Sequence, residues 1–326
     1  MGERFGTGNV KRLVKEQIKD KPAILFFVVF VFLSIFFVPR FAWTENLLNI
    51  VQQSADIIIL SCGMTFVFIN GSIDFSVTAI LGLSSIFGAM VLKLGGIPLI
   101  LIPAAILVML ATGMAIGLLN GLAVTKLKMP SFIATMATQL VFSGLALTIT
   151  RSRSIGGIPE SFNRISQGDI LGIPSPIFIM MAVMCVCVYL LNRTVFGRRI
   201  IAVGINQNTS RISGIPVEKT IIQVFVISGF LAALASIVMT ARLGAGLPAL
   251  GRDMLMDIVA AVVIGGTAVT GGKGNMIGTA IGAIFVITLN NSLNLLQMEW
   301  YFINVCKGVL ILVVALYVAV RMKSES

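Results

Sequence analysis

The segment from 265 to 274, GGTAVTGGKG, has glycines and a lysine that resemble a nucleotide-binding phosphate loop. Such a loop requires a glycine five positions before the Gly-Lys pair and a Ser or Thr directly after the lysine. Thr267 and Gly274 occupy these two positions, so the hydroxyl that would bind magnesium is missing. The sequence therefore excludes ATP binding here. It predicts a tight turn between two apolar segments, where glycine permits positive φ and close helix approach.

Histidine and cysteine supply no further chemistry. The chain has no histidine, which excludes histidine proton relays and histidine metal sites. Its four cysteines stand in apolar runs, and no two of them form a CxxC pair. We interpret them as small core residues rather than redox or zinc ligands. The sequence predicts no catalytic residue and no metal site.

Acidic and amide side chains occur close to several apolar segments. Asp74, in the stretch NGSIDFSVT, follows a glycine turn and opens an apolar run. It could cap free backbone amides at a helix start, or take part in a solute path, because acidic residues near membrane spans tend to be functional. The asparagines between 290 and 294 could line a polar path or bond between helices. The candidates for a path or gate are Asn70, Asp74, Ser76, Asp257, Asn290, Asn291 and Asn294.

The composition indicates what must position these residues. Of 326 residues, 57% are hydrophobic and 11% are charged, whereas a soluble domain carries roughly 25% charged residues. Repeated apolar runs of membrane-spanning length predict an all-α, polytopic membrane protein with about ten transmembrane helices. The second, third and eighth spans are short, so we expect broken or half-spanning helices among them. The expected spans are 22–38, 54–70, 77–94, 98–123, 131–150, 174–191, 220–241, 254–270, 275–296 and 302–320.

The net charge of +11 is distributed between the apolar segments and not along one basic face. This pattern argues against nucleic acid as a partner. The positive-inside rule places both termini and the central polar loop in the cytoplasm. We expect three parts: a basic cytoplasmic segment 1–21, which is either an interfacial helix or a solvated tail, a permease domain 22–320, and a cytoplasmic tail 321–326.

The longest polar interruption between two spans covers residues 193–219, RTVFGRRIIAVGINQNTSRISGIPVEK. Its glycines and Pro216 break regular structure and predict two short helical pieces. On charge alone, a plain cytosolic loop that obeys the positive-inside rule is the favoured interpretation, and a docking surface for a soluble partner is the alternative.

Four segments resemble one family, the bacterial ABC permeases that import ribose and other simple sugars. The pattern Gly197, Arg198, Ala202, Val203, Gly204, Asn206, Ser213, Gly214 and Ile215 looks like the cytoplasmic coupling loop of this family. The family pattern is also similar at 70–78, 254–274 and 289–296, with departures at Ser72, Thr78, Leu255 and Ser292. The resemblance covers about residues 60 to 320.

The resemblance implies a transport subunit of the bacterial cytoplasmic membrane and not an enzyme. Two permease chains, identical or related, would form a path at their interface within the lipid. A cytoplasmic ATPase subunit would grip the 193–219 loop, and ATP and magnesium would bind to that subunit and not to this chain. A periplasmic or surface-tethered binding protein would deliver the solute. The coupling residues implied are Gly197, Arg198, Arg199, Ala202, Gly204, Asn206 and Gly214.

The solute expected from the resemblance is a neutral sugar such as ribose or another monosaccharide. Autoinducer-2, nucleosides and branched-chain amino acids remain alternatives within the same class. A secondary transporter would need a coupling-ion site, and a membrane transferase would need an acidic metal-binding loop; the sequence favours neither. Complementary charge mainly sets register and association rate, so outside arginines are candidates for docking the binding protein: Arg151, Arg153, Arg164, Arg242 and Arg252.

Overall fold

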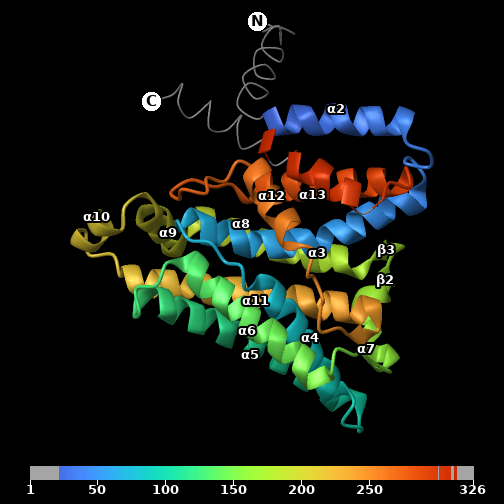
Figure 1. Cartoon of the computed structure of the whole chain (residues 1–326), viewed down its shortest axis with the longest axis horizontal. Coiled ribbons are helices and arrows are strands. Elements are labelled where there is room, and N and C mark those ends of the chain that lie inside the picture. The colour runs from blue at the N-terminus through green and yellow to red at the C-terminus, as the bar shows by residue number, and fades with distance from the viewer. Residues whose placement is uncertain (1–21, 300, 310–311, 314–326) are drawn as a thin grey trace, which may run out of the picture. The chain divides into compact units, whose positions relative to one another are not determined.

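The computed structural model describes residues 22–299, 301–309 and 312–313. The predicted parts 1–21 and 321–326, including the possible interfacial helix, lie outside the described residues. Over these residues the fold is helical (Figure 1), with four very short strands. The helices are α2 (Pro22–Phe37), α3 (Thr44–Ile69), α4 (Val77–Leu92), α5 (Pro98–Thr125), α6 (Ser131–Thr150), α7 (Glu160–Gln167), α8 (Ser175–Arg193), α9 (Val195–Ile205), α10 (Gln207–Ile212), α11 (Val217–Leu243), α12 (Leu255–Ile264) and α13 (Met276–Leu295).

The chain divides into two compact units. One comprises residues 48–287, and the other comprises 1–47 together with 288–326. The first contains the central polar loop and most of the predicted site residues. The second contains α2 and the asparagines of α13.

Six helices of the described residues are long and apolar enough to cross a membrane: α3, α5, α6, α8, α11 and α13. Three further apolar helices are shorter: the described part of α2, α4 and α12. The all-α, polytopic character expected from the sequence is confirmed. The count of ten spans and the cytoplasmic position of the termini stay predictions, and the expected tenth span lies partly outside the described residues.

Two expected boundaries were wrong. The second span was expected to begin at residue 54, but α3 begins at Thr44. Its first turns carry polar residues such as Asn49 and Gln52, which lower the hydropathy without interrupting the helix, because side-chain polarity does not affect the backbone hydrogen bonds. The eighth span was expected over 254–270, whereas α12 has only 10 residues. The glycine-rich segment after Ile264 ends it.

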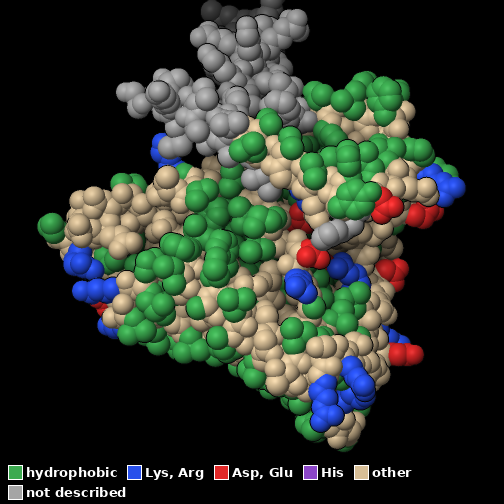
Figure 2. Space-filling view, viewed as in Figure 1, with side chains coloured by type: hydrophobic (Ala, Val, Ile, Leu, Met, Phe, Trp, Pro, Cys, Tyr) green, Lys and Arg blue, Asp and Glu red, His purple; other side chains and the backbone are tan. Residues whose placement is uncertain are grey.

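Helices α3 and α11 form the interior of the unit 48–287. The most apolar stretch of α3 is 83% buried and that of α11 is 67% buried, against 22% for α5 and 17% each for α6 and α8. The outer helices expose many large apolar side chains, and hydrophobic side chains cover much of the face seen in Figure 2. Such exposure suits lipid contact and would be unusual in water.

Small residues bring α5 and α11 into close contact. A Cβ added at Gly113 or Gly117 would overlap the carbonyl oxygen of Gly229 or Phe225, respectively. Added to Gly121, it would lie 2.9 Å from the Cα of Ile222. The four-residue glycine spacing in the sequence therefore marks a helix–helix contact that requires close backbone approach.

The segment between α6 and α8, which the expected spans 131–150 and 174–191 leave outside the membrane, is partly structured. It contains α7, and its strand β1 (Ile155–Gly156) pairs antiparallel with β4 (Ala245–Gly246), which directly follows α11. A second pair, β2 (Asp169–Ile170) with β3 (Ile173–Pro174), closes a short hairpin. Phe162 of α7 is fully buried among apolar residues of α4, α5 and α11.

Candidate functional site at the loop between α8 and α11

The central polar loop forms two short helices, α9 and α10, as the sequence predicts. Each begins with a capping side chain. Thr194 Oγ1 accepts a hydrogen bond from the Gly197 amide at 3.3 Å, and Asn206 Oδ1 accepts one from the Thr209 amide at 2.9 Å. Gly214 ends the loop with φ of +78°, which favours glycine. These caps make the loop a defined surface rather than a flexible connection.

Gly204, near the end of α9, lies against the C-terminal end of α3. A Cβ at this position would overlap the Ile69 carbonyl oxygen and would lie 2.7 Å from the Gly272 nitrogen. The Gly272 amide itself donates a hydrogen bond of 2.8 Å to the Ile69 carbonyl. At Gly271, with φ of +93°, a Cβ would lie 2.7 Å from the Gly204 carbonyl oxygen and 2.9 Å from the Gly71 Cα. Three segments that stand far apart in the sequence thus meet backbone to backbone.

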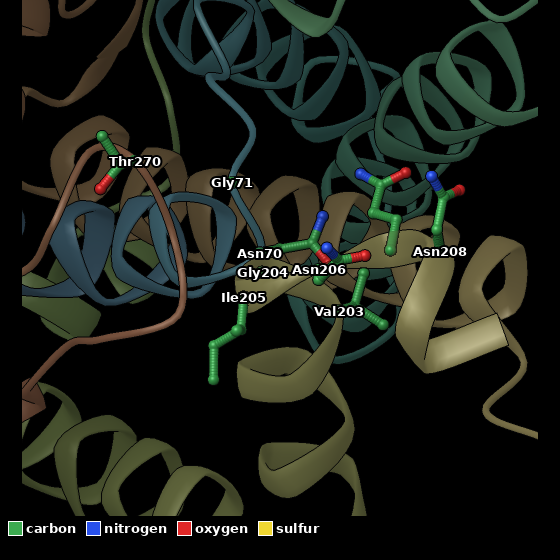
Figure 3. A pocket seen from close by; sticks show the side chains of 9 residues that line it. Asn70, Gly71, Val203, Gly204, Ile205, Asn206, Asn208 and Thr270 are labelled. Carbon is green, nitrogen blue, oxygen red and sulfur yellow. The ribbon is translucent and has the colours of Figure 1, made fainter. Parts of the chain in front are cut away.

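A polar pocket of about 420 Å³ opens at this junction (Figure 3). Asn70 and Gly71 follow α3, Thr270 precedes the GGKG turn, and the remaining lining comes from α9 and α10. Asn70 is fully buried, and its Oδ1 has no hydrogen-bond partner in the described part of the chain. The predicted residues Asn70, Gly204 and Asn206 are therefore brought together. The remaining residues of the lining are Val203, Ile205, Gln207 and Asn208.

The same loop exposes apolar side chains that sequence reasoning did not single out. Ile212 is 89% exposed and Ile205 is 70% exposed. Arg198 and Arg211 are exposed in the same segment, and Figure 2 shows Lys and Arg side chains next to the position of α10. An apolar contact surface with arginines is typical of a protein interface. The sequence held no signal for the isoleucines, because an apolar residue in a short helix normally faces inward.

Asp74 lies at the centre of a buried hydrogen-bond network. Its Oδ1 accepts from the Ser76 amide at 2.9 Å and from the Ser76 hydroxyl at 2.6 Å, and its Oδ2 accepts from the Ser228 hydroxyl at 2.9 Å. Asn120 donates to Ser76 Oγ at 2.8 Å, and Thr138 donates to Asn120 Oδ1 at 2.8 Å. The network connects α4, α5, α6 and α11.

Of the residues in this network, the sequence pointed only to Asp74 and Ser76. Ser228, Asn120 and Thr138 are common helix residues with no distinguishing context. Burial raises the pKa of the Asp74 carboxyl above its usual value, and the hydrogen bonds from Ser76 and Ser228 act in the opposite direction. Asp74 bonds the amide of Ser76, the residue before α4, so it caps no amide inside that helix.

The remaining path candidates lie in α12 and α13. Asp257 is buried in the first turn of α12, where a negative charge suits the helix dipole. In the unit 1–47 with 288–326, Asn291 exchanges two hydrogen bonds with Asn46, of 2.8 and 3.1 Å. Of the two interpretations of the asparagines, bonding between helices thus holds for Asn291. Asn290 is half-buried and Asn294 is exposed.

The candidate docking arginines differ in environment. Arg151, Arg153, Arg164 and Arg252 are exposed. Arg242 is three-quarters buried, and its Nη2 lies 2.5 Å from Oδ2 of Asp56, whose side chain is only 1% exposed. The charge of Arg242 is therefore engaged within the protein.

Comparison with known proteins agrees with this architecture. Residues 46–315 match the family model for the permease component of the branched-chain amino acid transport system. The chain is 39% identical to the ribose import permease protein RbsC of Bacillus subtilis, covering 94% of this chain and 95% of the relative. It is 36% identical to RbsC of Escherichia coli K12, covering 93% and 94%. It is also 36% identical to the D-allose transport system permease protein AlsC of Escherichia coli, covering 88% of both chains.

No solved structure is significantly similar to the chain. The family match covers most of the sequence, and the relatives are aligned over nearly their whole length. The six apolar helices agree with a multi-pass protein of the inner membrane. The chain belongs to the family of transport-system permease components that includes the ribose and simple-sugar ABC import permeases.

Proposed function

We propose that this chain imports a neutral monosaccharide, a ribose-like pentose, as the membrane-spanning subunit of an ATP-binding-cassette importer. The similarity to two ribose permeases and an allose permease supports the sugar. The description of the matching family model names a branched-chain amino acid transport system. Branched-chain amino acids are therefore the second candidate for the solute.

The observation that carries the mechanism is the junction of Gly204, Ile69 and Gly272. Its backbone contacts leave no room for a side chain between the α9–α10 loop and the end of α3. A force applied to the loop therefore acts directly on a helix of the interior. ATP and magnesium bind to a partner ATPase subunit in this proposal, and closure of that subunit moves the loop and, with it, α3.

The partners follow from the same proposal. The ATPase contacts the exposed surface of α9 and α10 on the cytoplasmic side. A substrate-binding protein docks on the opposite side, where Arg151, Arg153, Arg164 and Arg252 present positive charge. Arg242, named with them from the sequence, is a weaker candidate because it pairs with Asp56. A second permease chain, identical or related, completes the path.

The first experiment measures uptake of radiolabelled ribose by proteoliposomes that contain the permease, its ATPase and its loaded binding protein. ATP-dependent uptake supports the proposal. Stimulation only by a binding protein loaded with a branched-chain amino acid would favour the second candidate. Uptake by the permease alone, driven by a proton gradient, would contradict the importer mechanism.

The ATPase contact is tested by Ile212→Asp, at the most exposed apolar residue of the loop. We expect loss of ATPase copurification, because a charge would replace an apolar contact. The matched control is Leu171→Asp, a 97% exposed leucine in the hairpin before α8, on the side proposed to face away from the ATPase. Equal copurification of both variants with the ATPase would refute the contact.

A further inference from the structure

A second pocket, of about 310 Å³ and with a mixed polar and apolar lining, lies between the first half of α3 and the end of α11. Asn49, Gln52, Gln53 and Asp56 come from α3, and Arg242 comes from α11. Met239, Met254 and Ile287 complete the lining with apolar surface. From Asn49 to Ile69 a helix rises about 30 Å, so the pocket and the junction with Gly204 lie toward opposite ends of α3.

The pocket contains polar groups that the protein leaves without partners. Asp56 and Arg242 form an ion pair, yet Asp56 Oδ1 and Arg242 Nη1 have no hydrogen-bond partner in the described residues. The side-chain amide of Gln53 donates a hydrogen bond of 3.0 Å to the side-chain oxygen of Asn49. The side-chain amide of Gln52 makes no hydrogen bond among the described residues. Buried polar groups are normally satisfied, so the unpaired atoms of Asp56 and Arg242, together with the half-buried Gln52, point to a polar occupant.

The polar side chains of α3 at this pocket need an environment other than lipid. Polar side chains in a membrane-spanning helix are costly unless they face a bundle interior or an aqueous path. The pocket volume falls at the lower end of the range of about 300–1,000 Å³ that small-molecule sites occupy. That size suits a monosaccharide.

The charges select a neutral occupant. Asp56 and Arg242 neutralise each other at close range, so the pair offers no net charge to attract a charged solute. Hydroxyl groups both donate and accept hydrogen bonds. One solute with several hydroxyl groups can therefore donate to the free oxygen of Asp56, accept from the free nitrogen of Arg242 and bond to the side-chain amide of Gln52. The arrangement therefore matches a polyhydroxylated ring better than a solute that carries a net charge.

We propose that this pocket is a solute subsite of the translocation path, in which Asp56, Arg242 and Gln52 hydrogen-bond the hydroxyl groups of a monosaccharide after its release from the binding protein. The inference rests on the proposed function, because it requires that the chain carries a sugar. It adds the site and the groups that recognise the sugar within the membrane.

The test uses the complete transporter in proteoliposomes with ribose-loaded binding protein, and measures ribose moved per ATP hydrolysed. Gln52→Leu removes an amide without disturbing the ion pair. We expect ribose moved per ATP to fall about three- to tenfold, the effect of about one lost hydrogen bond, with ATPase stimulation unchanged. Gln139→Leu, at a half-buried glutamine of α6 outside the pocket, is the matched control and should leave the ratio unchanged.

Three outcomes would overturn the subsite. The ratio could stay at the wild-type value in both Gln52→Leu and Asn49→Leu. ATPase stimulation and uptake could instead fall together, which would indicate a structural role. A wild-type complex that responds only to an amino-acid-loaded binding protein would overturn the neutral-sugar argument. If the wild-type complex took up no ribose but responded to its binding protein loaded with another sugar, only the identity of the sugar would be wrong. The amount of that sugar moved per ATP would then be measured in the same variants.

Discussion

The backbone amide of Gly272 donates a 2.8 Å hydrogen bond to the carbonyl oxygen of Ile69, and Gly204 packs against the same carbonyl. The carbonyl oxygen of Ile69, at the end of α3, thus contacts both the GGKG turn and the α9–α10 loop. The glycine pattern that resembled a phosphate loop has a mechanical explanation here, since Gly271 meets Gly204 and Gly71 at distances that leave no room for a Cβ.

The first prediction concerns Gly204→Ala. The added methyl group would overlap the Ile69 carbonyl oxygen, so α9 must move away from α3. We expect ATP hydrolysis to continue while solute uptake per ATP falls several-fold, because the loop no longer moves α3. Gly144→Ala is the control, since a Cβ there meets nothing within 4 Å. Wild-type coupling in Gly204→Ala would show that the junction does not transmit the motion.

The second prediction concerns the contact of α5 with α11. Gly117→Ala would place a methyl group on the Phe225 carbonyl oxygen. Overpacking of this kind costs about 1–3 kcal/mol, and we expect the free energy of unfolding in mixed micelles to fall by this amount. The Gly144→Ala variant should change it little. Equal stability of the two alanine variants would mean that α5 and α11 do not pack as described.

The third prediction concerns Asp74 and Ser228, whose side chains share a 2.9 Å hydrogen bond. Asp74→Ala should lower the free energy of unfolding by about 1.5–3 kcal/mol, the range for hydrogen bonds to a charged group. Adding Ser228→Ala to that variant should cost much less than Ser228→Ala alone, because the partner is already gone. Additive effects in this double-mutant cycle would exclude a direct interaction.

The fourth prediction concerns the ion pair of Asp56 and Arg242. Arg242→Gln leaves a buried carboxylate without its cation, which typically costs about 3–5 kcal/mol. We expect the double variant Asp56→Asn with Arg242→Gln to recover much of this stability, since neither charge remains. Thermal unfolding of the three purified variants provides the measurement. A double variant less stable than Arg242→Gln would show that the two charges do not depend on each other.

The sequence predicted the helices better where hydrophobicity is uniform than where it is mixed. The expected boundaries of α5 and α13 agree with the structure within about three residues. The polar start of α3 was missed because Asn49, Gln52 and Gln53 reduce the hydropathy of a helix that continues without a break. Helix α7 was missed because its single buried Phe162 is anchored by distant helices, a contact with no local signal.

The sequence by itself determined the class of the protein. Apolar runs too long for a soluble core specify membrane helices, glycines and a proline divide the central loop into two short helices, and four segments identify the family. Only the tertiary structure decided which of these residues act together. The meeting of Gly71, Gly204 and Gly272, and the pairing of Asp56 with Arg242, join positions far apart in the chain. Such contacts depend on how helices pack against one another, and packing is a property of the whole bundle that no local pattern contains.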